Sequence, residues 1–175
     1  GLYSHLESRG GRHGETVSFG LQPILQRLAQ GITVANVDEA NEILTAHGEP
    51  FPYAGFMRIA DKLKGRIPLR IRAVPEGTVV PTHNVLMTVE STDPETFWIA
   101  SYFETQLMRV WYPTTVATQS WHIRKLISSY LEKSADDPAS EIAFKLHDFG
   151  SRGVSSEQSA MLGGLAHLVN FRGTD

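Results

Sequence analysis

The apolar and polar positions of the first third of the chain recur mainly at helical spacing. Residues 3–7 form a short strand-like run before the loop RGGRHG. The leucines and isoleucine that follow are spaced three and four apart, which predicts a helix over residues 20–30. A second helix is predicted over 37–47, with Asp38 and Glu39 in its first turn and Gly48 closing it. A weaker third helix covers 56–63.

The pattern then changes to an alternation of apolar and polar residues, which is typical of strands. Residues 67–74 read IPLRIRAV, and the turn at 75–77 is followed by β-rich segments at 78–80 and 85–90. The simplest structure for three such segments in a row is an antiparallel meander with one solvated face. We therefore expect the first domain to contain an antiparallel sheet together with helices.

Helical spacing returns after residue 91. Thr92, Asp93, Pro94 and Glu95 are typical of a helix start, and we expect that helix to continue until Pro113 breaks it. A second long helix is predicted from about 114 to 133. The stretch SADDPAS at 134–140 is the best boundary candidate, which predicts an N-terminal α+β domain over 1–139 and a second domain starting at 140.

The last 36 residues predict a βαβ unit, with a strand at 143–149, a helix at 156–165 and a strand at 167–171. Such a unit requires a parallel sheet or an α/β barrel, and ligands bind at the carboxyl ends of parallel strands. The predicted fold class is thus α+β for the first domain and α/β for the second. Phe149, Arg152 and Asp175 lie at or just beyond the ends of the two strands, so we expect them on one rim.

These three residue types together indicate a binding site for a ligand that has a planar polar ring and a phosphate group. An exposed aromatic ring can stack on such a ligand, a carboxylate can accept from an amide, and Arg152 lies between glycines just before a helix start, where an anion is favoured. In the alternative interpretation, Phe149 belongs to the core, Arg152 pairs with a surface acid, and residues 155–158 only cap the helix.

Other motifs exclude several classes of protein. HDFG is not accompanied by the remaining protein-kinase motifs, and GSRGVS is neither a P-loop nor a dinucleotide-binding fingerprint. None of the seven histidines forms an H-x-x-x-H or H-E-x-x-H pair, so we predict no metal site in this chain. Arg9, before two glycines, could clamp a phosphate, although an ordinary loop cation is the simpler interpretation.

The amino-acid composition limits the possible functions of the protein but does not identify one. The 175 residues are 41% hydrophobic and 20% charged, with a net charge of -3, which gives no global reason to bind nucleic acid or an anionic membrane. The absence of cysteine excludes disulfides and is compatible with the cytoplasm. The chain opens on GLYSHLESRGG without Met and stops after NFRGTD, so we expect a piece of a longer protein whose active site is incomplete here.

Four segments carry a resemblance to a known family. They are KLHDFGSRGVSSEQSA, HLVNFRGTD, VWYPTTVAT and the stretch from LRIRAVPEG to YFET. Together they resemble the nicotinamide phosphoribosyltransferase family, a type II phosphoribosyltransferase, in its N-terminal portion. The resemblance implies a pentosyltransferase of NAD salvage, which converts nicotinamide and phosphoribosyl pyrophosphate into nicotinamide mononucleotide and pyrophosphate. It also implies a cytoplasmic homodimer with active sites at the interface, and an antiparallel-sheet domain followed by an irregular α/β barrel.

The same resemblance assigns roles to residues of this sequence. It implies that Phe149 stacks on nicotinamide, Asp175 binds the carboxamide and Arg152 lies at the phosphate end. Arg9 would reach the phosphate region across the dimer interface.

The resemblance further implies that Lys145 and His147 line a tunnel behind the pocket. Mg²⁺ and ATP are implied as cofactors whose ligands are not within this chain. No catalytic residue is expected here, because loss of pyrophosphate needs positioning and charge stabilisation more than a nucleophile. Nicotinate phosphoribosyltransferase and a non-catalytic relative remain alternatives.

Overall fold

The computed structural model describes all 175 residues, which divide into two compact units made of separated stretches of chain. Unit 1 consists of Gly1–His5, Gln22–Arg72 and Met87–Leu107, and unit 2 consists of Leu6–Leu21, Ala73–Leu86 and Met108–Asp175. Each unit therefore combines stretches that are far apart in the sequence. The domain boundary between residues 139 and 140 stays a prediction.

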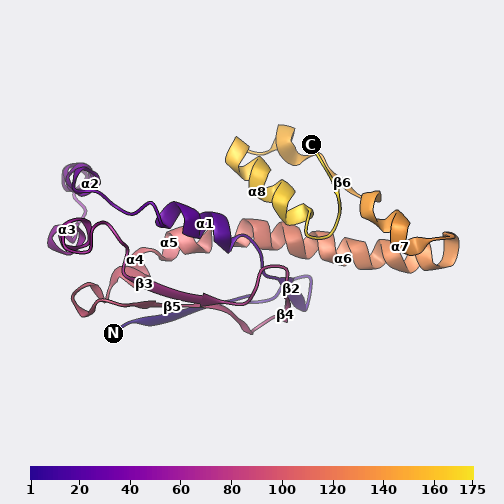
Figure 1. Cartoon of the computed structure of the whole chain (residues 1–175), viewed down its shortest axis with the longest axis horizontal. Coiled ribbons are helices and arrows are strands. Elements are labelled where there is room, and N and C mark those ends of the chain that lie inside the picture. Colours follow the sequence, from indigo (N-terminus) through magenta and orange to yellow (C-terminus); the bar gives the residue numbers. More distant parts are fainter. The chain divides into compact units, whose positions relative to one another are not determined.

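A three-stranded sheet lies mainly in unit 1, with the strand order β1 (Tyr3–Glu7), β5 (Val85–Ser91), β3 (Leu69–Ala73) (Figure 1). The alternation in IPLRIRAV is confirmed, because Arg70 and Arg72 are exposed while Leu69 and Ile71 are partly buried. The central strand β5 buries three apolar side chains, Leu86, Met87 and Val89. One face of β3 thus remains solvated, as the pattern predicts.

Three helices cover the first half of the chain: α1 (Leu21–Leu28), α2 (Val34–His47) and α3 (Tyr53–Asp61). All three predicted helices are present. The core of unit 1 joins Val37 of α2, Phe56 and Ile59 of α3, and Ile99. Gly55 permits the close approach of Trp98, whose ring would lie 2.5 Å from an added Cβ.

Helix α2 begins three residues before its predicted start. Thr33 accepts a hydrogen bond from the Asn36 amide at 3.2 Å, and Asn36 Oδ1 accepts one from the Thr33 amide at 3.0 Å. This reciprocal pair satisfies two amides that a helix start leaves without partners. The predicted start relied on Asp38 and Glu39 as first-turn acids, whereas the cap lies further upstream. Gly48 ends the helix with φ 84°, as expected.

The single helix predicted from residue 92 to Pro113 is wrong. The structure has a 3-10 turn η1 (Pro94–Thr96) and two short helices, α4 (Ile99–Tyr102) and α5 (Glu104–Met108). The predicted start is correct, because Asp93 caps η1 and Pro94 opens it. The segment is rich in Thr and aromatic residues of low helix propensity, and burial of Thr96, Ile99 and Leu107 decides its path.

The predicted three-strand meander is also wrong in its order. Strand β4 (Val79–Pro81) pairs antiparallel with β2 (Glu15–Val17) in unit 2, with Thr16 opposite Val80. The Ser18 carbonyl accepts from the Gly77 amide at 2.8 Å, and the Ser18 amide donates to the Thr78 carbonyl at 3.0 Å. These bonds hold the turn and the start of β4 against the chain that follows β2. Local alternation cannot reveal a partner so far away in the sequence.

The long helix α6 (Trp111–Ser134) contains Pro113 in its first turn and is not broken by it. A proline is tolerated there because the first amides of a helix have no intrahelical partner. Pro113 is buried against Gly20, where an added Cβ would lie 2.1 Å from the proline ring. The predicted helix from about residue 114 is confirmed and starts slightly earlier. No helix combines the length and apolar character needed to cross a bilayer.

The C-terminal part of unit 2 contains a parallel pair of very short strands, β6 (His147–Asp148) and β7 (Gly173–Thr174). The intervening chain forms the 3-10 turn η3 (Gly150–Gly153) and α8 (Glu157–His167), which packs against α6 and runs obliquely to it in Figure 1. Before β6 come α7 (Pro138–Glu141) and the 3-10 turn η2 (Ile142–Phe144). The order strand, helix, parallel strand is therefore confirmed.

Both predicted strand ranges in this part need correction. Residues 143–149 are mostly turn, with only His147 and Asp148 in a strand, and residues 167–171 contain no strand. The apolar run HLVNF reads like a buried strand, but Phe171 is 1% exposed because it packs against Leu131 and Ile142 in the core. A short apolar run does not distinguish a strand from another buried segment.

Candidate functional site

The carboxyl ends of β6 and β7 form the candidate site, which we call the rim. Asp148 lies opposite Thr174 in the parallel register, so Phe149 and Asp175 are the next residue on each strand. The Asp175 amide donates to the Asp148 carbonyl at 3.0 Å and extends the pairing by one step. Two residues distant in sequence thus leave the sheet at one edge, where ligands of parallel sheets bind.

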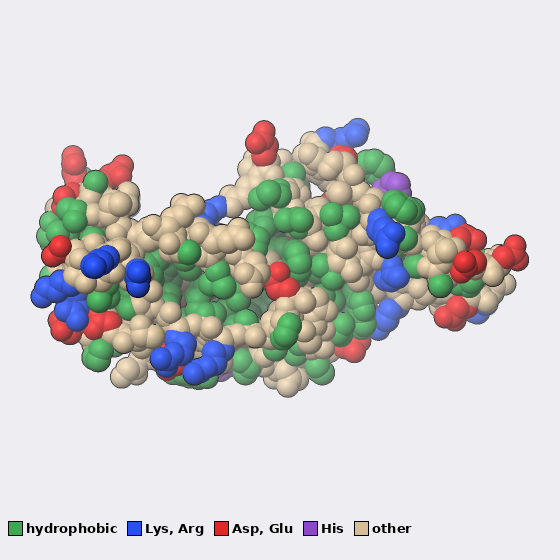
Figure 2. Space-filling view, in the orientation of Figure 1, with side chains coloured by type: hydrophobic (Ala, Val, Ile, Leu, Met, Phe, Trp, Pro, Cys, Tyr) green, Lys and Arg blue, Asp and Glu red, His purple; other side chains and the backbone are tan.

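Phe149 does not belong to the core in this chain. Its side chain is 61% exposed, and its ring lies 5.8 Å from the ring of His147 between centroids. The ring of Phe144 lies a further 6.2 Å beyond His147. Figure 2 shows hydrophobic side chains and a histidine together on the surface over this part of the chain. This exposed ring speaks against the alternative interpretation and leaves a face open for stacking.

Asp148 connects the two sides of the rim and was not singled out as a site residue from the sequence. Its carboxylate Oδ1 accepts a hydrogen bond from the Gly150 amide at 2.9 Å, while its carbonyl accepts from Asp175. The side chain is only partly exposed. A sequence signal exists, because an aspartate two residues before a glycine is typical of a side-chain-stabilised turn.

Three glycines allow the elements behind the rim to approach closely. A Cβ on Gly173 would lie 2.4 Å from the His147 ring, and a Cβ on Gly164 would lie 3.0 Å from Thr174 Oγ1. On the neighbouring position of α8, a Cβ on Gly163 would lie 2.7 Å from the Tyr112 hydroxyl of α6. The sequence contains these glycines, but only the structure identifies what each one faces.

Arg152 lies in η3, and its side chain is exposed and forms no ion pair within the chain. Four residues later, Ser156 caps α8 by accepting from the Ser159 amide at 3.1 Å. The cap predicted at Ser155 with Gln158 is therefore shifted by one residue. The guanidinium lies just ahead of a helix start, as predicted, and is available to an anionic group.

The other predicted site residues, Lys145, His147 and Arg9, are not among the three predicted substrate ligands at the rim. Lys145 forms an ion pair with Glu141 at 2.7 Å, and His147 covers Gly173. Arg9 is exposed in the loop between β1 and β2, near the bond from the His83 amide to the Ser8 carbonyl at 2.8 Å. Nothing within the chain brings Arg9 to Phe149. Its role as a phosphate ligand stays a prediction.

A stacked histidine pair elsewhere in unit 2 could not be seen in the sequence. The rings of His13 and His122 lie 3.7 Å apart, and the Nε2 atom of His122 is buried without a hydrogen bond. Burial, and then the proximity of His13, lower the pKa of His122. A neutral imidazole is favoured at this position. No group of three His, Asp or Glu residues in the chain lies together so as to hold a metal ion.

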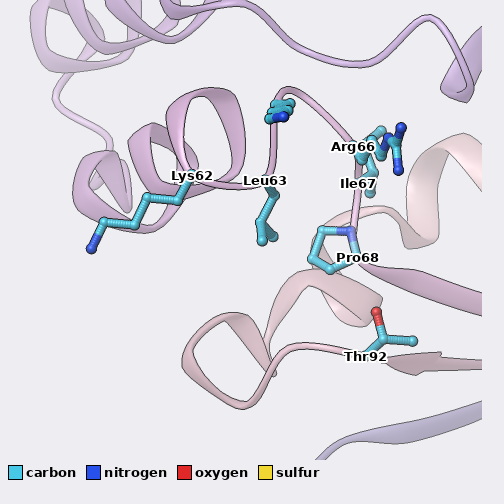
Figure 3. Close-up of a pocket in the computed structure, with 7 residues that line it drawn as sticks. Lys62, Leu63, Arg66, Ile67, Pro68 and Thr92 are labelled. Atoms are coloured by element: carbon cyan, nitrogen blue, oxygen red, sulfur yellow. The ribbon is translucent and has the colours of Figure 1, made fainter.

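Unit 1 has a shallow hollow of about 460 Å³ with seven lining residues: Lys62, Leu63, Lys64, Arg66, Ile67, Pro68 and Thr92. Figure 3 shows Lys62 and Arg66 pointing in different directions and not toward one another. A phosphate site requires donors that converge on one point. The hollow therefore does not form a second candidate site, and the rim remains the site to be explained.

Comparison with known proteins first identifies the class. The fold is similar to that of human nicotinic acid phosphoribosyltransferase, with a TM-score of 0.63 and 19% identity over 98% of this chain and 31% of the human chain. Residues 144–175, which include the whole rim, match the nicotinate phosphoribosyltransferase family. The match of residues 144–175 agrees with the resemblance seen in the sequence, whereas the structural similarity shows a similar fold only.

The more specific similarity is to nicotinamide phosphoribosyltransferases. Residues 1–71 match the N-terminal domain of that family. The chain is 58% identical to the nicotinamide phosphoribosyltransferase of Xanthomonas campestris over 174 residues, covering 99% of this chain and 37% of the relative. It is 37% identical to that of Acinetobacter baylyi over 112 residues, covering 63% of this chain and 22% of the relative. The chain thus spans well under half the length of these curated relatives.

Proposed function

We propose that the full-length protein is a nicotinamide phosphoribosyltransferase. The observation that carries the proposal is the 58% identity to the Xanthomonas campestris enzyme across nearly the whole chain. The reaction would join nicotinamide to phosphoribosyl pyrophosphate and release nicotinamide mononucleotide and pyrophosphate in NAD salvage. The rim supports this proposal because Phe149 and Asp175 follow paired strands, and Arg152 lies three residues after Phe149.

Each rim residue suits one part of the substrates. The exposed ring of Phe149 can stack on the planar nicotinamide ring. Asp175 can accept a hydrogen bond from the carboxamide and repel the carboxylate of nicotinate, which would make the site selective by attraction and by repulsion. Arg152 can bind a phosphate group of phosphoribosyl pyrophosphate or its product. The three roles need no proton transfer from these side chains.

The proposed reaction requires no nucleophilic side chain from this part of the protein. The bond between the sugar carbon C1 and pyrophosphate breaks, and the ring nitrogen of nicotinamide forms the new bond to C1. The sugar becomes positively charged in between, so the protein contributes by positioning and by stabilising charge. Mg²⁺ and ATP are proposed cofactors, and bound Mg²⁺ would neutralise pyrophosphate charge. We assign no residue of this chain to the metal, because no suitable ligand group is present.

The quaternary structure and the rest of the fold are part of the same proposal. We infer a cytoplasmic homodimer with its active sites at the interface, in which Arg9 reaches the partner's phosphate region. The exposure of Arg9 supports this role. The parallel pair β6–β7 would be the start of an irregular α/β barrel, and Lys145 and His147 would line a tunnel behind the nicotinamide pocket.

Nicotinate phosphoribosyltransferase is a second candidate function. It is favoured by the match of residues 144–175 to that family and by the similar fold of the human enzyme. The structural similarity at 19% identity concerns the fold alone. The two candidates differ in one chemical respect, which is whether the rim prefers an amide or a carboxylate next to Asp175.

A competition assay on the full-length protein tests both candidates. We expect wild type to convert nicotinamide in preference to nicotinate, and Asp175→Asn to reduce that preference by about tenfold or more, because a like-charge contact is lost. Asp136→Asn, in an exposed loop, is the matched control and should keep the preference. Wild-type preference for nicotinate would support the second candidate. Turnover of neither substrate would support a non-catalytic relative.

A further inference from the structure

Asp148 occupies a position between the two halves of the rim. Its Oδ1 atom accepts from the Gly150 amide at 2.9 Å, at the start of the turn that carries Arg152. Its backbone carbonyl accepts from the Asp175 amide at 3.0 Å. One residue thus contacts both segments that bear the proposed substrate ligands. The Asp148 side chain is partly buried, and its carboxylate contacts the backbone two residues further along the chain.

We propose that Asp148 is a positioning residue for the substrate site, a role that rests on the proposed function. The carboxylate fixes the turn after Phe149 and thereby the directions of the Phe149 ring and the Arg152 guanidinium. It is not a catalytic residue, because it acts through the Gly150 amide and the chain around it. The geometry gives it this role independently of which pyridine is bound.

The rim needs such a fixed turn because little else orders it. Strands β6 and β7 have two residues each, which is too short to be stable by pairing alone. Phe149 is 61% exposed, so core packing does not fix its ring. Ordering an exposed side chain and its backbone costs conformational entropy that a ligand would otherwise have to offset on binding. A turn that is already formed reduces this cost.

The surroundings of Asp148 fit an acceptor on a short side chain. An aspartate side chain reaches the amide two residues ahead, and its oxygen accepts the bond. A Cβ on Gly150 would lie 2.9 Å from Oδ1, and a Cβ on Gly164 would lie 3.9 Å from Oδ2. The glycines therefore leave room for the carboxylate on both sides. An asparagine would keep the acceptor atom, whereas an alanine would remove it.

Steady-state kinetics of the full-length protein test the role. We expect Asp148→Ala to raise the KM for both nicotinamide and phosphoribosyl pyrophosphate and to lower kcat/KM by about 10- to 100-fold. Asp148→Asn should stay within about threefold of wild type, because the acceptor remains. Asp137→Ala is the matched control. It removes the same kind of bond, from the Ser140 amide to Asp137 Oδ1 at 3.2 Å, in an exposed helix cap.

Each outcome of the kinetics decides for or against the proposal. Wild-type kinetics for Asp148→Ala, or an equal loss for Asp137→Ala, would overturn it. An equal loss for Asp148→Asn would also overturn it, because the charge rather than the acceptor would then matter. If Asp148→Ala fails to fold, Asp148→Glu takes its place, because the longer side chain keeps the charge and displaces the acceptor from the Gly150 amide. Raised KM values for Asp148→Glu then support the positioning role, and wild-type KM values contradict it.

Amide hydrogen exchange provides a readout that does not depend on activity. In the full-length protein, the Gly150 amide should exchange about tenfold faster in Asp148→Ala than in wild type, because its bond is lost. It should exchange at the wild-type rate in Asp148→Asn and in Asp137→Ala. Unchanged exchange in Asp148→Ala would refute the positioning role. If the variants show these exchange rates but the wild-type protein forms no nicotinamide mononucleotide, only the proposed function is refuted.

Discussion

Unit 1 and the rim of unit 2 contain the same residue types in opposite environments. In unit 1, Phe56 is 5% exposed, and its ring lies 5.0 Å from Phe51, 5.2 Å from Trp98 and 4.9 Å from Tyr102 between centroids. At the rim, Phe149 is 61% exposed and has a histidine as its nearest ring neighbour. One aromatic side chain is thus part of a core, and the other is available to a ligand.

The charged residues show the same difference. Arg58 of unit 1 donates to the Asp93 carboxylate from Nε at 2.8 Å and from Nη2 at 3.2 Å, and also pairs with Glu95 at 3.2 Å. At the rim, Arg152 and Asp175 are exposed without an ion pair. Unit 1 uses these residues to stabilise its own fold. The rim leaves them unpaired, which is what a binding site for a charged ligand requires.

The largest effect should separate the two phenylalanines. Phe56→Ala should lower the free energy of unfolding by about 3–5 kcal/mol, because it leaves a cavity in a packed aromatic cluster. Phe149→Ala should change it by less than about 0.5 kcal/mol. It should instead raise the KM for nicotinamide about two- to tenfold through lost stacking. Chemical denaturation and steady-state kinetics check the pair, and a strongly destabilised Phe149→Ala would contradict the comparison.

A smaller effect should appear in the acid range. The hydrogen bond from Arg58 holds the pKa of Asp93 below its usual value, although burial opposes this. The ion pair therefore stabilises the protein fully above the unfolded pKa of about 3.9, and the stabilisation is lost as the pH falls through the lower folded pKa. Melting temperatures measured from pH 6 downward to about 2 should fall less steeply for Asp93→Asn than for wild type.

Two controls define this acid effect. In Arg58→Ala, the melting temperature should fall less steeply as the pH decreases, as in Asp93→Asn, because the hydrogen-bond donor to Asp93 is removed. Arg66→Ala removes an exposed cation from the same unit and should leave the slope unchanged. If all three variants give the same slope as wild type, the pair does not contribute to acid stability.

The smallest effect concerns the two capped helices. Thr33→Ala at α2 and Ser156→Ala at α8 each remove an acceptor for a helix amide, at 3.2 Å and 3.1 Å. Each should lower the free energy of unfolding by about 1 kcal/mol. Only Ser156→Ala should also raise the KM for phosphoribosyl pyrophosphate, because α8 starts just after Arg152. An equal rise for Thr33→Ala would contradict a site confined to the rim.

Elements that depend on local chemistry were predictable from the order of the residues alone. The helices over 20–30, 37–47 and 114–133 are present because apolar spacing and capping residues act within one or two turns. The order strand, helix, parallel strand at the C-terminal end was also predictable, together with the placement of Phe149 and Asp175 after paired strands. The quoted segments were sufficient to suggest the family.

The pairing of strands and the composition of the cores depend on long-range contacts in the folded chain. The tertiary structure paired β4 with β2 rather than with its neighbours in sequence, broke the helix after residue 92, and buried Phe171 in a core instead of a strand. It also placed Asp148 between Gly150 and Asp175. These choices depend on contacts between residues far apart in sequence, because the free energy of burial and pairing exceeds the small differences in local propensity.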